Sequence, residues 1–221
     1  MKGIVFNVRR NLRLPKLSKP KISLKEFVSK KGAEVFLILT FLFGLIIGAM
    51  SSRSADTELI ERLDFLFSTN LHTRAELSSF EIFVSCFGSD FIFLLAVFLM
   101  GLSVWGSITL PFVILFKGFS VGLSSALIFS LYRASGIGFY ILVLLPGIVM
   151  FLLALIYYSK ESFSLSMRYI RLSIFGSVKE PYLSKYLKRF FIRSLMALLL
   201  TAGSALLDML LWILFAHMFD F

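Results

Sequence analysis

Long uncharged apolar stretches are the feature that most restricts what this chain can fold into. About 20 apolar residues carry an α-helix across a hydrocarbon core roughly 30 Å thick. Backbone groups in lipid must be hydrogen-bonded within their own segment, and the sequence lacks the alternating ten-residue pattern of a barrel strand. We therefore predict an all-α, polytopic membrane helical bundle with about five transmembrane helices. The predicted spans are residues 35–50, 91–110, 111–132, 137–158 and 194–219.

The composition excludes an ordinary soluble domain. Of the 221 residues, 58% are hydrophobic and 16% are charged, whereas soluble domains are about 45–50% apolar and about 25% charged. Cys86 is the single cysteine, which excludes an internal disulfide and a cysteine-cluster metal site. His72 and His217 are the only histidines, so histidine-based catalysis has little to work with. We therefore expect no catalytic site, no cofactor and no metal.

The net charge of +10 is divided unevenly along the chain. Residues 1–34 carry a net charge of +8, residues 51–90 carry −4, and residues 159–193 carry +6. With five spans, the two basic segments fall on one side of the membrane and the acidic segment on the other. The positive-inside rule then places the N-terminus in the cytoplasm and the C-terminus outside. We predict a basic cytoplasmic arm (1–34) and a cell-membrane domain (35–221), with 51–90 external and 159–193 a cytoplasmic basic loop.

The segments outside the membrane contain two patterns that are typical of amphipathic helices. In the external segment, Leu59, Leu63 and Leu66 recur at helical spacing, which predicts a helix that forms a cap or a platform for a partner. In the cytoplasmic loop, residues 181–194 predict a helix with Tyr186 and Phe190 on an apolar face and Lys188 and Arg189 on a basic face, which favours a position in the membrane interface. Docking of a cytoplasmic partner there is the alternative. The basic arm is either a lipid attachment or a topology signal, and nucleic-acid binding is disfavoured because no binding module accompanies it.

Two charged residues within the predicted spans are candidates for a functional role. Lys117 lies roughly 10 Å from the cytoplasmic side of its predicted span, and Asp208 lies roughly 20 Å from that side. Charged groups at membrane depth are expensive and mark functional sites by default. The two residues could form an ion pair that fixes helix order, or belong to a solute or proton path. In a purely structural interpretation, the lysine extends to the interface and the aspartate is hydrogen-bonded near water.

Glycine pairs with G-x-x-x-G spacing occur in two of the predicted spans. Gly44 with Gly48, and Gly118 with Gly122, would let helix backbones approach closely, either within one chain or between copies in a homo-oligomer. Residues 118–122 also spell G-x-S-x-G, the serine-hydrolase pattern. That pattern needs a strand-turn-helix elbow, whereas here it lies in an apolar helix without a histidine at matching depth. We therefore interpret the glycines as helix-packing residues.

Several short motifs resemble those of the stage II sporulation protein M family. They are a glycine-containing turn, a proline that opens the next span, LFKGFSVG (115–122) and LLPG (144–147). The resemblance implies a non-catalytic, multi-pass membrane protein acting in septal membrane engulfment during endospore formation. It also implies partners, namely envelope peptidoglycan hydrolases such as stage II sporulation proteins D and P.

Two functions therefore remain open from the sequence. The first is an integral membrane scaffold that recruits or positions peptidoglycan-remodelling enzymes. The alternative is a small membrane transporter or channel subunit that uses Lys117 and Asp208. Lipid binding by the basic loop is a third, weaker interpretation, and membrane lipid is an expected partner in every case.

Overall fold

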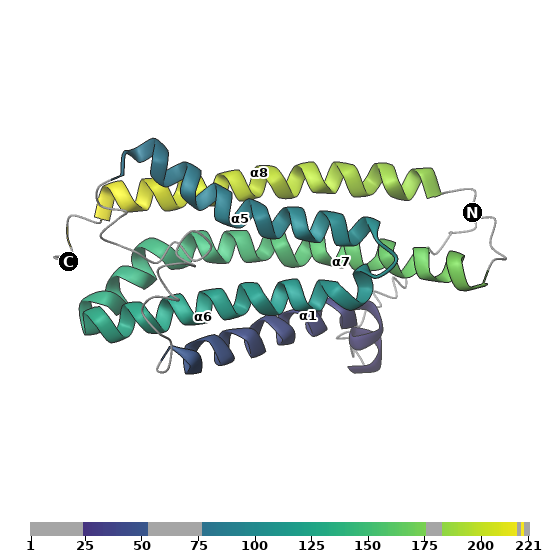
Figure 1. Ribbon diagram of the computed structural model, residues 1–221, viewed down its shortest axis with the longest axis horizontal. Helices are drawn as coiled ribbons and strands as arrows, with labels where there is room; N and C mark the ends of the chain where they lie inside the picture. Colours follow the sequence, from purple (N-terminus) through teal and green to yellow (C-terminus); the bar gives the residue numbers. More distant parts are fainter. Residues whose placement is uncertain (1–23, 53–76, 176–182, 216–217, 219–221) are drawn as a thin grey trace, which may run out of the picture. The chain divides into compact units, whose positions relative to one another are not determined.

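The structure is a computed structural model that describes residues 24–52, 77–175, 183–215 and 218, and every element in these ranges is helical (Figure 1). The predicted all-α class is confirmed. The chain divides between Gly32 and Ala33 into two units; α1 crosses this boundary, and the contacts described below all lie in the second unit. In chain order they are α1 (Leu24–Ser51), α5 (Ser79–Leu102), α6 (Gly106–Phe139), one turn of π-helix η1 (Tyr140–Leu144), α7 (Leu145–Phe175) and α8 (Leu183–Phe215).

Four helical stretches of the described residues are long and apolar enough to cross a membrane: Gly32–Ser51, Ser79–Leu102, Gly106–Arg171 and Tyr186–Phe215. The prediction of a multi-pass membrane protein is therefore confirmed. The number differs from the predicted five because the third and fourth predicted spans lie in one helical stretch of 66 residues. Many large apolar side chains point away from the bundle, as lipid-facing residues do; among them Leu153 is 68% exposed.

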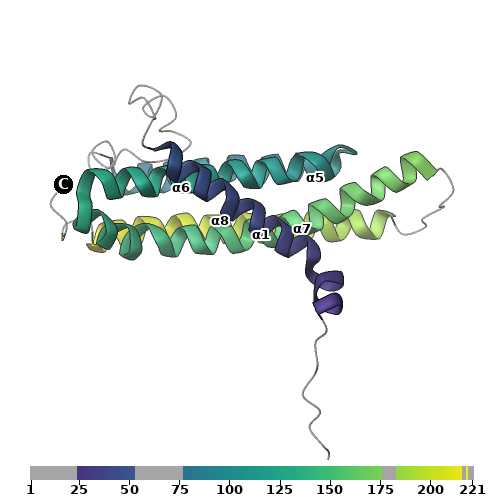
Figure 2. The same cartoon turned by 90° about the horizontal axis from the view of Figure 1, so that it is seen from below.

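That 66-residue stretch is not one straight helix. Arg133 has a φ of 49° and a ψ of −124°, which are not helical values. Figures 1 and 2 show that the chain turns back here, so that α6 and α7 run side by side. A straight helix of this length would measure roughly 100 Å, about three times the hydrocarbon thickness. The reversal at Arg133 removes that mismatch.

The break between α5 and α6 lies at Ser103–Trp105, not at Pro111 as the predicted boundary between spans had it. The connection is held by α7, because the Ser166 hydroxyl accepts from the Ser107 N–H at 2.7 Å. The same hydroxyl donates to the carbonyl oxygens of Ser103 and Val104. Pro111 is the sixth residue of α6, early in the helix, where a missing N–H disturbs few hydrogen bonds.

The basic segment 159–193 is largely helical rather than a loop. It forms the second half of α7 and the first turns of α8, with residues 176–182 outside the described part. The aromatic face at the start of α8 packs on the bundle, because the Phe190 ring stacks on Tyr158 and on Phe98. Arg168 lies over the Tyr186 ring at 3.7 Å. The prediction of a helix lying in the membrane interface is therefore corrected: these side chains contact α5 and α7.

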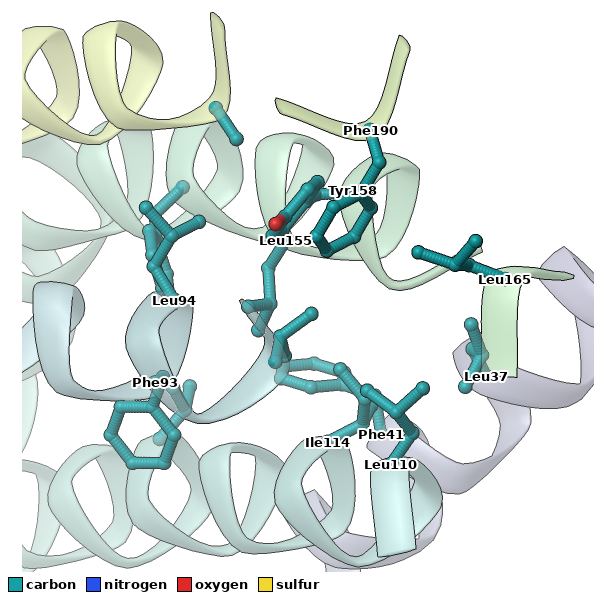
Figure 3. Packing of buried hydrophobic residues seen from close by; sticks show 14 residues of the cluster. Leu37, Phe41, Phe93, Leu94, Leu110, Ile114, Leu155, Tyr158, Leu165 and Phe190 are labelled. Atoms are coloured by element: carbon teal, nitrogen blue, oxygen red, sulfur yellow. The ribbon is translucent and has the colours of Figure 1, made fainter. Parts of the chain in front are cut away.

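One hydrophobic cluster joins all five long helices (Figure 3). In lipid, helices associate through close packing rather than through the hydrophobic effect, so shape complementarity must hold this cluster together. A second cluster lies at the other end of the bundle, where the Phe139 and Trp212 rings meet edge to face. The first cluster includes Leu37 and Phe41 of α1, Phe93 and Val97 of α5, Ile114 of α6, Leu155 of α7 and Ala197 of α8.

Candidate functional site

A buried ion pair joins α5 and α6 near the middle of both helices. The Lys117 ammonium lies 2.7 Å from Oδ1 of Asp90, and the two side chains are 9% and 11% exposed. Lys117 is the twelfth residue of α6, roughly 16 Å from the start of the helix. This is deeper than the predicted 10 Å because α6 begins at Gly106. An isolated charge at this depth would cost about 3 kcal/mol, so the pairing is a requirement of the location.

Aromatic rings complete the surroundings of the lysine. Its ammonium lies 4.8 Å from the centroid of Phe93 in α5 and 4.8 Å from that of Phe151 in α7. Both rings present a negative π-face to the cation, and such contacts are worth about 2 kcal/mol when desolvated. Lys117 of α6 thus contacts both α5 and α7. The interpretation in which its side chain extends to the membrane interface is therefore wrong.

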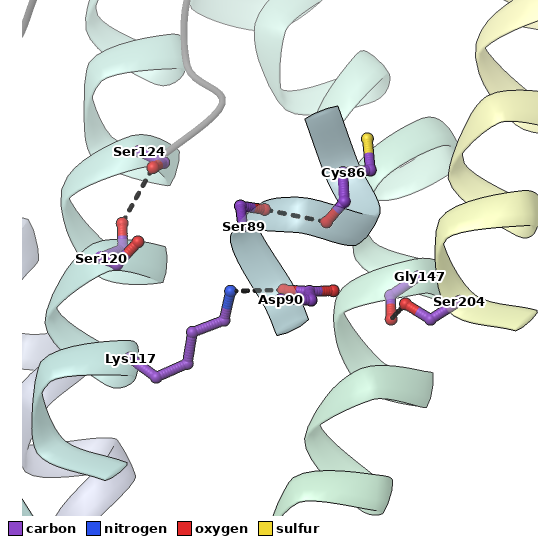
Figure 4. A network of polar contacts seen from close by, with 8 residues as sticks. All are labelled: Cys86, Ser89, Asp90, Lys117, Ser120, Ser124, Gly147 and Ser204. Carbon is purple, nitrogen blue, oxygen red and sulfur yellow. Dashed lines mark hydrogen bonds and ion pairs between the residues drawn. The ribbon is translucent and has the colours of Figure 1, made fainter. Parts of the chain in front are cut away.

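The ion pair opens on a small cavity of about 70 Å³ at the meeting of α5, α6, α7 and α8 (Figure 4). One water needs roughly 10–15 Å³ of such volume, so there is room for a few waters but not for a metabolite. The Ser89 hydroxyl donates to the Cys86 carbonyl oxygen, and the Ser124 hydroxyl to that of Ser120. The polar residues lining the cavity are Cys86, Ser89, Asp90, Lys117, Ser120, Ser124, Tyr140 and Asp208.

Asp208 also lines this cavity, but the ion pair of Lys117 is formed with Asp90. A Cβ atom at Gly147 would overlap Oδ1 of Asp208, so the glycine lets the carboxyl group lie against the backbone of α7. The Ser204 hydroxyl donates to the Gly147 carbonyl oxygen at 3.1 Å (Figure 4). Pro146 and the π-helical turn η1 come directly before this glycine. Leu144, the first residue of the LLPG motif, lines the cavity, so the motif contributes to one of its walls.

The two G-x-x-x-G pairs lie at one contact between α1 and α6. A Cβ atom at Gly44 would overlap the carbonyl oxygen of Leu115, and one at Gly122 would overlap that of Leu45. The contacts advance in the same direction along both helices, so α1 and α6 run parallel and cross obliquely (Figure 2). Backbone-to-backbone approach of this kind requires glycine. Gly48 and Gly118 make the equivalent contacts with Phe119 and Phe41.

Charged residues also join helices at a second place, which we call the basic end. It comprises the Ser103–Trp105 turn, the C-terminal half of α7 and the first turns of α8 (Figure 1). Lys160 pairs with Glu34 at 2.6 Å, and Glu161 pairs with Arg193. Among the described side chains from Ala33 onward, the charges at this end are Lys160, Arg168, Arg171, Lys188, Arg189 and Arg193 against Glu34 and Glu161.

The remaining candidate chemistry of the sequence is not assembled in the described part of the chain. Ser120, the serine of G-x-S-x-G, is buried within α6, where a strand-turn-helix elbow does not exist. Among the described residues, no group of three or more His, Cys, Asp or Glu side chains could hold a metal ion. His72, His217, most of the arm 1–34 and the predicted external helix near Leu63 lie outside the described residues.

Asp90 is the functional residue that sequence reasoning missed. It was assigned to the external segment because the uncharged stretch begins after it, at Phe91. The helix begins twelve residues earlier, at a capping box in which the Ser78 N–H donates to the Glu81 carboxylate at 2.7 Å. The Ser-x-x-Glu pattern at 78–81 is the signal that would have placed Asp90 inside a span.

Comparison with known proteins gives one match. The family model described as stage II sporulation protein M matches residues 37–218, more than half of the chain. The match covers the ion pair, the cavity and both glycine pairs, and it confirms the resemblance seen in the LFKGFSVG and LLPG motifs. No curated protein and no solved structure matches the chain.

Proposed function

The chain belongs to the stage II sporulation protein M family, and on this premise we propose that it is a non-catalytic membrane scaffold that positions peptidoglycan-remodelling enzymes. The observation that carries the proposal is how the polar groups of the bundle are used. The buried charges of Lys117 and Asp90 neutralise each other within the bundle, and the Ser89 and Ser124 hydroxyls at the cavity donate to backbone carbonyl oxygens. Such an interior stabilises helix positions and leaves recognition to the outer surfaces.

The proposal includes five membrane crossings, with the N-terminus in the cytoplasm and the C-terminus outside. The reversal at Arg133 divides the 66-residue stretch into two crossings. The parallel contact between α1 and α6 agrees with this order, because odd-numbered crossings run in the same direction. The basic end then faces the cytoplasm, as the positive-inside rule requires. Cysteine accessibility at Ser177 tests the orientation, and an externally labelled Ser177→Cys variant would reverse it.

The partners we propose are envelope peptidoglycan hydrolases such as stage II sporulation proteins D and P, bound through the external segment. The test is affinity purification of the full tagged chain from cross-linked membranes of its own sporulating host. We expect the wild-type chain to recover envelope hydrolases. A variant in which residues 53–76 are replaced by a Gly/Ser linker of equal length should insert normally and lose them.

Two results would contradict this proposal. One is recovery of no hydrolase by the wild-type chain. The other is a deletion strain in which engulfment proceeds normally and wall hydrolases keep their location. Equal recovery by the linker variant would leave the scaffold role standing but would move the binding surface to the helices.

The buried ion pair and its cavity favour a second candidate, a channel or transporter subunit for a proton or a small ion. The volume of about 70 Å³ is too small for a larger solute. In liposomes, the purified chain would then produce a proton or cation flux that Lys117→Met abolishes. Absence of flux, or the same flux in the variant, would dismiss this candidate.

A further inference from the structure

An apolar groove runs along the outer surface between α5 and α8. Its volume is about 350 Å³, which is five times that of the polar cavity. Leu195 and Phe191 on its α8 side are 59% and 52% exposed, and Leu95 on its α5 side is 41% exposed. The lining residues are Phe91, Leu94, Leu95, Phe98, Phe191, Ser194, Leu195 and Leu198.

The groove is short compared with the bilayer. Its lining covers residues 91–98 of α5 and 191–198 of α8, which is seven residue steps or roughly 10 Å along each helix. A partner transmembrane helix is itself about 10–12 Å wide and would need a matching surface over much of the roughly 30 Å core. An acyl chain is narrow enough to fill a hollow of this length.

The basic end lies just beyond the groove. Lys188 precedes Phe191 by three residues and Leu195 by seven, so all three share one face of α8. Lys188 is exposed, whereas the next residue, Arg189, faces α7 on the other side of the helix, 3.9 Å from Glu161. No acidic residue lines the groove. A phosphate at the mouth of the groove would therefore meet the Lys188 ammonium at an end of the bundle that is basic overall.

We propose that this groove is a binding site for an anionic phospholipid, with one acyl chain between α5 and α8 and the phosphate beside Lys188. The apolar hollow and the basic mouth are arranged in the order in which a lipid presents its chain and its headgroup. Basic residues near the membrane surface attract anionic lipid by about 1 kcal/mol each, which corresponds to roughly a fivefold preference per charge. The site is independent of the scaffold role proposed above.

The test is native mass spectrometry of the full chain released from detergent micelles. The micelles contain equal amounts of phosphatidylglycerol and phosphatidylcholine with identical acyl chains. We expect the wild-type chain to retain phosphatidylglycerol preferentially, and Lys188→Gln to lower the ratio by roughly fivefold. Leu195→Trp, which fills the groove without changing the charge, should lower retention of both lipids. Leu95→Trp repeats this test from the α5 side.

Arg171→Gln is the matched control, because this exposed residue of α7 removes the same charge from the same end without lining the groove. We expect its lipid ratio to equal that of the wild type. A loss equal to that of Lys188→Gln would reduce the effect to bulk charge and overturn the site. Unchanged retention in both tryptophan variants would also overturn it. A change of oligomeric state in Leu195→Trp, with lipid retention unaltered, would instead assign the groove to a second copy of the chain.

Discussion

Ion pairs hold helices together in two regions of this bundle, and the two regions differ in what surrounds the charges. At the centre, Asp90 and Lys117 are about nine-tenths buried and lie between aromatic rings. At the basic end, Glu34 and Lys160 are 26% and 35% exposed at a comparable distance. Burial, rather than the length of the contact, decides how much a missing partner costs. We therefore expect the central pair to specify how the helices associate, and the outer pair of Glu34 and Lys160 to contribute little.

The largest effect is expected for Lys117→Met. This change leaves Asp90 as a buried charge without its ammonium partner, and breaking a buried pair in this way costs about 3–5 kcal/mol. The free energy of unfolding, measured by titrating SDS into micelles of the purified chain, should fall by this amount. The double variant Lys117→Met/Asp90→Leu should regain a large part of it. If the losses of the single variants Lys117→Met and Asp90→Leu add up to the loss of the double variant, the two residues are not coupled.

The next effect is expected where α1 meets α6 without any charge. Gly122→Leu places a side chain against the backbone of Leu45, and overpacking of this kind costs about 1–3 kcal/mol. Gly88→Leu in α5 is the control, because a Cβ atom there meets nothing within 4 Å. Thermal unfolding in detergent measures the stability of each variant, and light scattering measures its oligomeric state. Unchanged behaviour of Gly122→Leu would remove the glycine contact from the bundle.

At the basic end, we expect a larger effect from the neutral residue Ser166 than from the ion pair of Glu34 and Lys160. Ser166→Ala removes the hydroxyl that holds the α5–α6 connection, and a net hydrogen bond is worth about 1 kcal/mol. The turn at Ser103–Trp105 should also become more accessible, which amide hydrogen exchange can measure. Ser164→Ala, an exposed change two residues earlier in α7, should have no effect on either measurement. Equal exchange in the two variants would contradict the role of Ser166.

The smallest effect is expected for Glu34→Gln. A partly exposed pair such as Glu34 and Lys160 contributes about 0–1 kcal/mol, and salt screens it. The free energy of unfolding should change little at low ionic strength, and the difference from wild type should vanish at high ionic strength. A loss as large as that of Lys117→Met would contradict the distinction between the two regions.

Much of this fold could be predicted from the sequence because membrane insertion leaves a strong compositional signal. The apolar stretches predict the helices, and the charged residues within them single out Lys117 and Asp208. The G-x-x-x-G spacing singles out the four glycines. The helix ends were harder to predict. A span limit drawn at the first charged residue placed Asp90 outside the membrane, whereas a capping box begins the helix twelve residues earlier. A limit drawn at a proline placed the α5–α6 break at Pro111, whereas the break lies at the turn held by Ser166.

Which charged residues meet could not be predicted from one sequence. Lys117 finds Asp90 because α5 and α6 are adjacent and both residues lie near mid-helix, so the pairing depends on helix neighbours rather than on depth alone. The packing of residues 183–190 on α7 was missed for a related reason. Basic and aromatic residues in alternation suit a membrane interface equally well, and only the presence of Tyr158 and Phe98 nearby decides between the two.

The parallel contact between α1 and α6 has a consequence for how the protein is made. The ribosome completes α1 more than fifty residues before it begins α6, an interval on the order of ten seconds or less at usual synthesis rates. During that time α1 must wait in the bilayer without its final partner. Its surface suits such a delay, because the face that later meets α6 is glycine and hydrocarbon, and the Thr40 hydroxyl bonds to its own helix at Phe36. The contact between α1 and α6 can thus form only after α5 and α6 have been synthesised, when a helix already in the membrane docks onto a newly made one.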